Sequence, residues 1–394
     1  MQAPDARRLG ATVLTGFAVA GGAPLAVVAV SLVGVAAVPP RLLVATTALG
    51  LLMFCVPLAV WLGYARTVAS GGGLYAYVRE AAGERAARWQ GWIWSVAYVL
   101  YLPYTVVYIV DDLLPSVLPV RGALAAGLEV ALAAGLCAAA AFAGGGLPRV
   151  LTLLAGAEVV TVAAWAALVL GGSHGGPVVA VPLTAADWSR VAAGGAQVSQ
   201  LLVCSSLVTF LGGEARDAGA VRRSLLLAFA VLAGSVFVGA LVLAAGAAPG
   251  GDSALPGASL AGRYGGAAAA LALAFAALAA VAGLIVAEFA ALVRLWRAMF
   301  ALPEGKGTAV VSALFLAGTV ASLAGPQRFY SLTLPPSLMA LFASQAIVFA
   351  TYPLLPHTTR GSAIRAWALA LLACAWAVYG LVGAVRGSGL LGYG

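Results

Sequence analysis

The chain has 394 residues, of which 63% are apolar and only 9% are charged. A soluble domain carries about 25% charged residues, so composition excludes a soluble fold of this size. We therefore predict an all-α membrane protein with lipid as its main solvent. The formal net charge of +8 comes from basic residues placed singly or in pairs at the ends of apolar stretches. That placement is typical of topology determinants rather than of a nucleic-acid-binding surface.

Eleven apolar stretches are each long enough to cross a hydrocarbon core of ~30 Å. In lipid they must form helices, because an open sheet cannot satisfy its backbone there. Between the second and third stretches, Gly71–Arg88 predicts a short amphipathic helix at the membrane surface. The predicted spans are residues 10–37, 42–65, 90–114, 121–143, 148–170, 196–220, 224–247, 264–300, 307–325, 329–354 and 363–386.

The basic residues also predict the orientation. With a cytoplasmic N-terminus, fifteen of the 21 Lys and Arg residues fall in cytoplasmic loops, as the positive-inside rule requires. An odd number of spans then places the C-terminus outside. Lys306 is the only lysine, and the excess of Ala, Gly and Val is typical of a GC-rich bacterial genome. We therefore expect a bacterial cytoplasmic membrane protein.

Two spans contain a pair of glycines in their interior: Gly21-Gly22, followed by Pro24, and Gly212-Gly213. Inside a helix glycine costs ~1 kcal/mol relative to alanine, and proline removes a hydrogen bond. Matching interruptions in two halves of a chain indicate a transporter site made of broken helices. Close helix packing is the alternative explanation. We predict breaks near Gly21–Pro24 and Gly212–Glu214 that face each other near the bilayer centre.

Three segments resemble the amino acid–polyamine–organocation (APC) superfamily of transporters. Ser70–Arg79, followed by Gly83 and Gly91-Trp92, is similar to the family's link between the second and third helices. Leu207–Glu214 resembles its sixth helix, and Val293–Ala298 resembles the end of its eighth helix. The resemblance implies a LeuT-type bundle with five-plus-five inverted repeats at about 10–170 and 196–354. Residues 1–355 would form this core, and residues 356–394 an eleventh span and a short tail.

The same resemblance implies a substrate site between the first and sixth helices. Where a helix unwinds, its N–H groups suit a carboxylate and its carbonyls suit an ammonium, so a zwitterionic amino acid fits. Tyr101 and Tyr104 share a face of the third span and are predicted to line the path, unless they form an aromatic packing stripe. The other predicted substrate residues are Gly21, Gly22, Ala23, Pro24, Thr209, Phe210, Leu211, Gly212 and Gly213.

Three carboxylates are candidates for proton coupling: Glu158, Glu214 and Glu288. A charge at mid-membrane costs ~2.5 kcal/mol or more, so such residues are usually functional. Glu158 lies nine residues beyond Arg149, about 13 Å into the membrane. A structural role is the alternative for each, and Glu288 could pair with Arg294 or Arg297. Sodium-coupled members of this fold use hydroxyls of the eighth helix, which Gly265–Met299 lacks, so protons are favoured.

We therefore expect a secondary active transporter of amino acids, neutral or apolar ones in preference, working by alternating access. A cationic amino acid or amine is the alternative, with Glu214 as counter-ion. A membrane-embedded enzyme would need clustered ionisable residues, and the two histidines, His174 and His357, fall on opposite sides of the membrane. A channel would need rings of charge or a filter repeat, and a metal transporter an acidic or Met-bearing break. No enzymatic activity, cofactor or nucleic-acid partner is expected; the partners are the substrate, protons and lipid.

Overall fold

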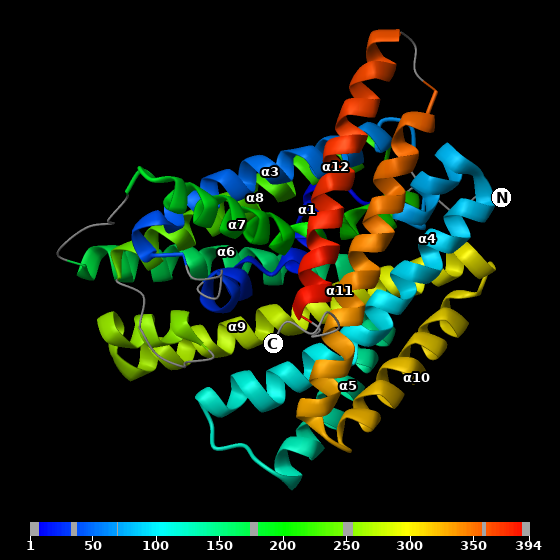
Figure 1. Ribbon diagram of the computed structural model, residues 1–394. Coiled ribbons are helices and arrows are strands. Elements are labelled where there is room, and N and C mark those ends of the chain that lie inside the picture. The colour runs from blue at the N-terminus through cyan, green and yellow to red at the C-terminus, as the bar shows by residue number, and fades with distance from the viewer. Residues whose placement is uncertain are drawn as a thin grey trace.

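The computed structural model describes residues 8–32, 38–68, 70–173, 180–246, 255–356 and 360–387. All named elements in these ranges are helices (Figure 1). Eleven helical segments are long and apolar enough to cross a membrane, so the predicted number of spans is confirmed. They are Ala11–Ser31, Pro40–Tyr64, Leu74–Ser116, Ala123–Phe142, Gly144–Gly172, Ala185–Glu214, Ala218–Ala245, Pro256–Phe300, Gly305–Ser322, Pro326–Leu354 and Gly361–Arg386.

Several spans combine an α-helix with a short 3-10 or π segment. Those of the first half are α1 (Ala11–Gly22), α2 (Pro24–Ala26), η1 (Val27–Ser31), η2 (Pro40–Leu42), α3 (Leu43–Tyr64), α4 (Leu74–Val107), η3 (Tyr108–Leu113), η4 (Leu114–Ser116), α5 (Ala123–Ala143), η5 (Gly144–Gly146) and α6 (Leu147–Gly172). The others are α7 (Ala185–Leu201), η6 (Val203–Glu214), α8 (Ala218–Ala245), α9 (Pro256–Phe300), α10 (Glu304–Ser322), α11 (Pro326–Thr351), η7 (Tyr352–Leu354) and α12 (Arg360–Gly387).

Three predicted boundaries differ from the structure. The sixth span begins at Ala185, eleven residues before the predicted start, because Thr184 caps a polar first turn by accepting a hydrogen bond from the amide of Asp187 (3.1 Å). The surface helix and the third span are one element, α4, which bends at Gly83. Helix α9 likewise starts at Pro256 and bends at Gly266. Residues 33–37, the two histidines and the tail 388–394 lie outside the described residues.

The bend of α4 depends on a glycine. Gly83 has φ 82° and ψ 174°, a backbone conformation that only glycine adopts readily. No atom lies within 4 Å of a Cβ built there, so a methyl group would meet no neighbour. Gly83→Ala should therefore lose about 1–3 kcal/mol through backbone strain alone.

Thermal unfolding of the purified protein in detergent would show this loss as a lower Tm. Gly156→Ala in α6 is the matched control, since its Cβ also meets open space but its backbone is helical. There alanine should leave the Tm unchanged or raise it, because helix propensity gains about 1 kcal/mol. Equal Tm values for the two variants would contradict the strain at Gly83.

The first span lies at the centre of the bundle, where α1 packs against α6, α8, α9 and η6. Small residues allow this close approach: a Cβ at Gly16 would lie 2.6 Å from the Cα of Thr152 on α6. The eleventh span, α12, packs against α11, α3 and α7. Its Trp376 indole donates a hydrogen bond to the hydroxyl of Ser199 (2.8 Å), which fastens this additional helix to the sixth span.

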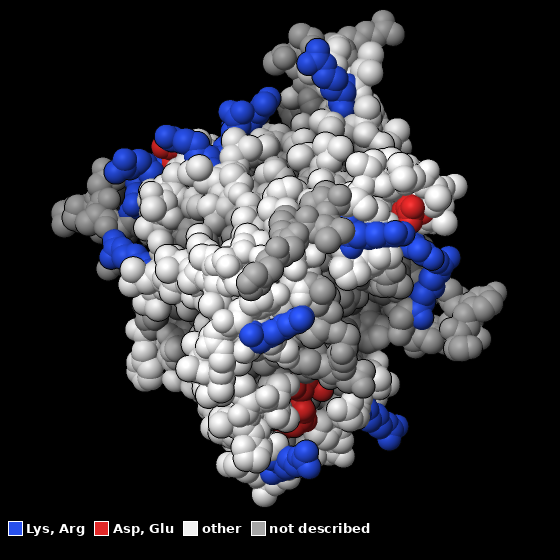
Figure 2. All heavy atoms as spheres, turned by 90° about the vertical axis from the view of Figure 1, so that its left-hand side faces the viewer, with Lys and Arg blue, Asp and Glu red and all other residues white. Residues whose placement is uncertain are grey.

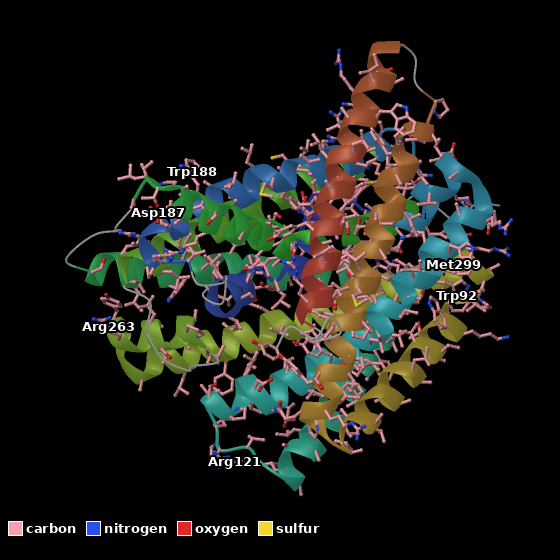
Figure 3. The ribbon with its side chains drawn as sticks, viewed as in Figure 1. Trp92, Arg121, Asp187, Trp188, Arg263 and Met299 are labelled. Carbon is pink, nitrogen blue, oxygen red and sulfur yellow. The ribbon has the colours of Figure 1, made fainter. Side chains whose placement is uncertain are left out.

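The bundle has two ends that are used as references below. Figure 3 places Arg121, Asp187, Trp188 and Arg263 toward one end, called the Arg121 end, and Trp92 and Met299 toward the other, called the Met299 end. Figure 2 looks onto the Arg121 end, where basic side chains are scattered around the edge. Arg121 and Arg263, both predicted to be external, thus share one end of the molecule.

Candidate functional site

The first span is interrupted in its middle. Helix α1 ends at Gly22, Ala23 adopts the left-handed conformation (φ 40°, ψ 61°), and Pro24 begins α2. A left-handed non-glycine residue costs about 1–2 kcal/mol, and proline at the first helical position has no N–H to place. The interruption predicted near Gly21–Pro24 is therefore confirmed.

The sixth span is interrupted at Leu202. Helix α7 ends at Leu201, and after this residue the chain continues as the 3-10 helix η6, Val203–Glu214. Because 3-10 runs longer than 3–4 residues are uncommon, these 12 residues form a distinct half of the span. The break predicted at Gly212–Glu214 is wrong in position, since the change of helix type comes ten residues earlier.

The glycine pair of the sixth span has a packing role instead. A Cβ at Gly212 would lie 2.7 Å from the carbonyl oxygen of Ser70, and one at Gly213 would lie 2.7 Å from the amide nitrogen of Gly71. Both glycines thus let η6 approach the backbone of the glycine-rich turn before α4. This contact explains why glycines occur here without interrupting the helix.

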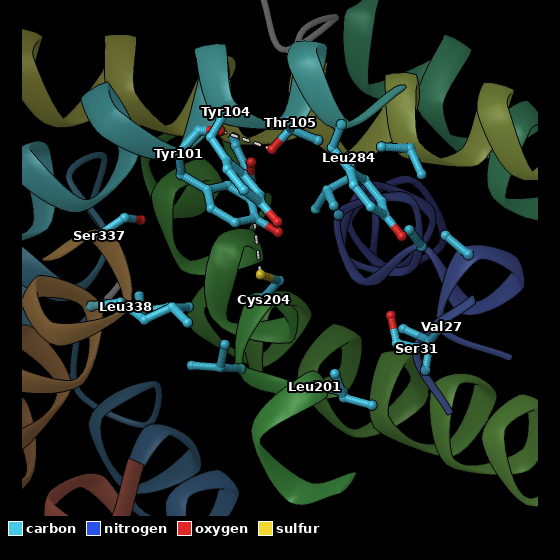
Figure 4. A pocket seen from close by; sticks show the side chains of 18 of the residues that line it. Val27, Ser31, Tyr101, Tyr104, Thr105, Leu201, Cys204, Leu284, Ser337 and Leu338 are labelled. Carbon is cyan, nitrogen blue, oxygen red and sulfur yellow. Dashed lines mark hydrogen bonds between the residues drawn. The ribbon is translucent and has the colours of Figure 1, made fainter. Parts of the chain in front are cut away.

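The two interruptions border one cavity of about 300 Å³, shown in Figure 4. Its walls come from the first, third, sixth, eighth and tenth spans. In the close-up, Val27 and Ser31 of the first span face Ser337 and Leu338 of α11, with Cys204 of η6 between them. The residues at the two breaks that line it are Gly21, Gly22, Ala23, Gln200, Leu201, Val203 and Cys204.

Five tyrosines form one wall of the cavity: Tyr98, Tyr101, Tyr104, Tyr108 and Tyr330. The Tyr104 hydroxyl donates to the Tyr330 hydroxyl at 2.7 Å, and their ring centroids are 4.5 Å apart. Tyr108 and Tyr330 lie near the ends of their helices, so this wall extends toward the Arg121 end. Tyr101 and Tyr104 thus occupy the predicted position beside the candidate path.

The cavity also contains a carboxyl group, close to Tyr98 and Tyr101. Glu288 of α9 has 0% exposure, and its Oε1 accepts a long hydrogen bond from the Cys204 thiol (3.7 Å). Its Oε2 has no partner, and neither has the Nε2 of Gln200. Among the described lining residues, Glu288 is the only acidic or basic side chain. A buried polar atom without a partner is costly, so both atoms are available to a ligand.

Six of the predicted substrate residues lie outside the cavity lining: Pro24, Thr209, Phe210, Leu211, Gly212 and Gly213. Phe210 is buried in an aromatic layer, with its ring 4.6 Å from that of Trp94, which in turn lies 4.0 Å from Tyr98. Thr209 donates its hydroxyl to the carbonyl of Ser206 (2.7 Å). Because the break lies at Leu202, the five residues Thr209–Gly213 of η6 close the cavity toward the Met299 end instead of facing it.

Glu158 lies beside the first-span break, outside the cavity lining. It is 2% exposed, and its carboxyl lies near the backbone amide of Leu25 in α2. Neither carboxyl oxygen makes a hydrogen bond. The protein thus holds a second carboxyl without a partner next to the part of the first span that is interrupted.

Glu214 takes part in a set of contacts that closes the Met299 end of the bundle. Its carboxylate accepts from the Arg294 guanidinium at 2.7 Å. Its carbonyl accepts from the amide of Leu9 (2.8 Å), and the amide of Arg216 donates to the carbonyl of Leu9 (3.1 Å). Arg294 therefore pairs with Glu214 and not with Glu288, and the counter-ion role predicted for Glu214 is not supported by its position.

The sequence contained a signal for the residues that were missed. Ser199, Gln200, Cys204, Ser205 and Ser206 place five small or polar side chains within eight positions of an apolar span. Such a cluster is unusual in lipid and indicates a cavity or a helix contact. It surrounds Leu202, where the span changes its helix type.

Known proteins resemble this chain in structure and not in sequence. No protein-family model and no curated protein sequence matches it. A manganese transporter from Eremococcus coleocola, solved with an aromatic bis-isothiourea compound, superposes with a TM-score of 0.60 at 14% identity, over 97% of this chain and 88% of the transporter. Mhp1, a nucleobase-cation-symport-1 family transporter with bound bromovinylhydantoin, gives 0.58 at 14% identity, over 98% and 94%. Both have the LeuT-type fold, so the chain has this fold as well.

Proposed function

We propose that this chain is a secondary transporter that works by alternating access around its two interrupted helices and carries a neutral amino acid. One observation carries the proposal. The interruptions at Ala23 and Leu202 border the same cavity, together with the unpartnered carboxyl oxygen of Glu288. Two broken helices around a site at mid-membrane are typical of secondary transporters.

The cavity offers complementary groups for a zwitterion. The last carbonyls of α1 lack helical partners and lie at the negative end of that helix, so they suit an ammonium together with Glu288. The Gln200 amide and the tyrosine hydroxyls suit a carboxylate. Val27, Leu284 and Leu338 provide an apolar surface for a side chain. The volume of about 300 Å³ lies at the small end for ligand pockets, as an amino acid requires.

Two other substrate classes have an observation in their favour. A cationic amino acid or amine would also use Glu288, which replaces Glu214 as the candidate counter-ion. A flat heteroaromatic ring, like the hydantoin in Mhp1, would stack on the tyrosine wall. A divalent metal fits less well, because no group of three or more His, Cys, Asp or Glu side chains among the described residues could hold one.

Ligand panels would decide between these classes. The purified protein would be heated with neutral amino acids, amines, hydantoins or nucleobases, and Mn²⁺, and stabilising compounds would be tested for uptake into proteoliposomes. We expect neutral amino acids to raise the Tm and to be transported. Stabilisation only by Mn²⁺ or only by heteroaromatic compounds would overturn the proposed substrate and leave the transport mechanism in place.

We further propose that protons drive transport and that Glu158 carries them. Its two unpartnered oxygens lie beside α2, directly after the interruption of the first span. Burial of this kind disfavours the charged form of a carboxyl, and a change of charge there would bias a two-state element. From Gly265 to Met299 the eighth span has neither Ser nor Thr, so this part of it lacks the hydroxyls of a sodium site.

The contacts at the Met299 end form a gate in this proposal, and that end faces the cytoplasm. Glu214→Gln weakens the pairing with Arg294, whose side chain is 14% exposed, and should shift the protein toward states open to the cytoplasm by about fivefold, or ~1 kcal/mol. The test labels Cys204 with a membrane-impermeant maleimide, after the other three cysteines have been replaced by alanine. In inside-out vesicles, this labelling should become about fivefold faster in Glu214→Gln than in the protein with Glu214.

The swap Glu214→Arg/Arg294→Glu should restore slow labelling, because it rebuilds the ion pair. Glu84→Gln provides the control: it removes an exposed ion pair with Arg88 (2.9 Å) and should leave the labelling rate unchanged. The gate would be refuted by unchanged labelling in Glu214→Gln, or by equal acceleration in the control.

A further inference from the structure

A second cavity at the Met299 end is lined by three arginines from three different spans. Arg66 follows α3, Arg222 lies in the first turns of α8, and Arg365 lies in the first turns of α12. Each is within four residues of the end of a predicted membrane span. The cavity measures about 380 Å³, and its other lining residues are Ala59, Leu62, Gly63, Tyr352, Ser362, Ala366 and Leu369.

Within the described part of the chain, no acidic side chain of this cavity balances its positive charge. No Asp or Glu is among its described lining residues. Ion pairs are formed by Arg41, Arg88, Arg223 and Arg294, whereas none is found for the three arginines of the cavity within the described part of the chain. The contrast is sharpest in α8, where Arg223 pairs with Asp217 (3.9 Å) and its neighbour Arg222 faces the cavity. Like charges around one space repel each other and favour an anion between them.

The surroundings of the cavity on the membrane side are apolar. Ala59, Leu62 and Leu369 line it directly. About one turn farther into the membrane, Leu226 and Leu227 of α8 are 42% and 50% exposed, and Leu371 of α12 is 67% exposed. A small soluble anion would leave this apolar surface uncovered, whereas acyl chains would cover it.

We propose that this cavity binds the head group of an anionic phospholipid, with the phosphate between the three guanidinium groups and the acyl chains along α8 and α12. Guanidinium groups form paired, charge-assisted hydrogen bonds with phosphate oxygens. Basic pockets between spans on the cytoplasmic side suit such head groups. The lipid bridges α3 and α8 of the core to the eleventh span, and so fastens the first turns of α12, whereas the Trp376–Ser199 contact holds its middle.

The test compares lipids and a soluble anion on the detergent-purified full-length protein. Phosphatidylglycerol, phosphatidylcholine with matched chains, and inorganic phosphate would each be titrated, with Tm and native mass spectrometry as readouts. The variants are Arg222→Gln/Arg365→Gln and, as a control, Arg85→Gln/Arg149→Gln, which removes two exposed arginines of the predicted cytoplasmic set that lie outside this cavity. The single variant Arg365→Gln, at an exposed position, serves if the double variant is not monodisperse.

We expect phosphatidylglycerol to stabilise the wild type and the control more than phosphatidylcholine does. Each arginine near a membrane surface contributes ~1 kcal/mol, so binding should weaken roughly fivefold in Arg365→Gln and roughly 25-fold in the cavity double variant. Three results would each overturn the proposal: no preference for phosphatidylglycerol in the wild type, equal weakening in the control, or stabilisation by inorganic phosphate that matches that of the lipid. None of these readouts depends on transport, so the test is independent of the proposed function.

Discussion

Glu288→Gln should weaken binding of the amino acid substrate by at least about 30-fold and abolish measurable transport. The glutamine has the same shape and can keep the contact with the Cys204 thiol, but it removes the only acidic side chain among the described residues that line the cavity. Leaving a buried charge without its partner costs about 2–5 kcal/mol, which corresponds to roughly 30- to several thousand-fold in affinity. Radioligand binding to the purified protein would measure the effect.

The matched control for this experiment is Glu129→Gln. Glu129 of α5 is also buried (1% exposed), but it accepts a hydrogen bond from the Ser322 hydroxyl (2.8 Å) and does not line the cavity. Its substitution should change the Tm and leave the substrate Kd within about twofold of wild type, given that distant sites act independently. Wild-type affinity in Glu288→Gln would remove the ammonium site from the proposal.

Glu158→Gln should abolish accumulation driven by a pH gradient while keeping substrate binding. Glutamine mimics the protonated carboxyl, so the first span would lose the change of charge beside Leu25 that links protons to its movement. In proteoliposomes with an imposed pH gradient, we expect the internal concentration of substrate to stop at that outside. Exchange of labelled for unlabelled substrate should continue, because it requires no net proton movement.

The decisive comparison is the pH profile of uptake with and without sodium. The wild type should respond to pH and not to sodium, and Glu158→Gln should respond to neither. A Glu158→Gln profile equal to that of the wild type would contradict the role of this residue. A sodium requirement in the wild type would contradict proton coupling as a whole, without affecting the substrate site at Glu288.

The architecture could be predicted from sequence because each span carries its own signal. A stretch of about 20 apolar residues must be a helix in lipid whatever its neighbours are, so the eleven spans could be predicted. The LeuT-type fold was implied only by the resemblance of Ser70–Arg79 and Leu207–Glu214 to the APC superfamily. The boundary of a span that begins with polar turns could not be predicted in this way. The first turns of α7, with Asp187 and Arg190, are too polar to be recognised as part of a span, although Thr184 caps them.

The candidate site could be predicted from the sequence only in part. A pair of glycines in a membrane helix can either accompany a break or allow close packing. At Gly21-Gly22 it precedes a real interruption, which Pro24 makes unavoidable. At Gly212-Gly213 it allows contact with the backbone of Ser70. No local property of the second pair distinguishes these uses, since the partner segment is about 140 residues away in sequence. The availability of Glu288 could not be predicted either, because only the folded structure shows that Arg294 forms its ion pair with Glu214.

The 3-10 helix η6 makes the sixth span longer than an α-helix of the same residues would make it. At a rise of ~2.0 Å per residue, the 12 residues of η6 extend about 24 Å, whereas the same residues in an α-helix would extend about 18 Å. Its far end is anchored by the bonds of Glu214 to Leu9 and Arg294. If η6 rewound as an α-helix, Cys204, ten residues before Glu214, would move about 5 Å toward that anchor. A switch of η6 between the 3-10 and the α-helical form can thus lengthen or shorten this wall of the cavity without unfolding any helix.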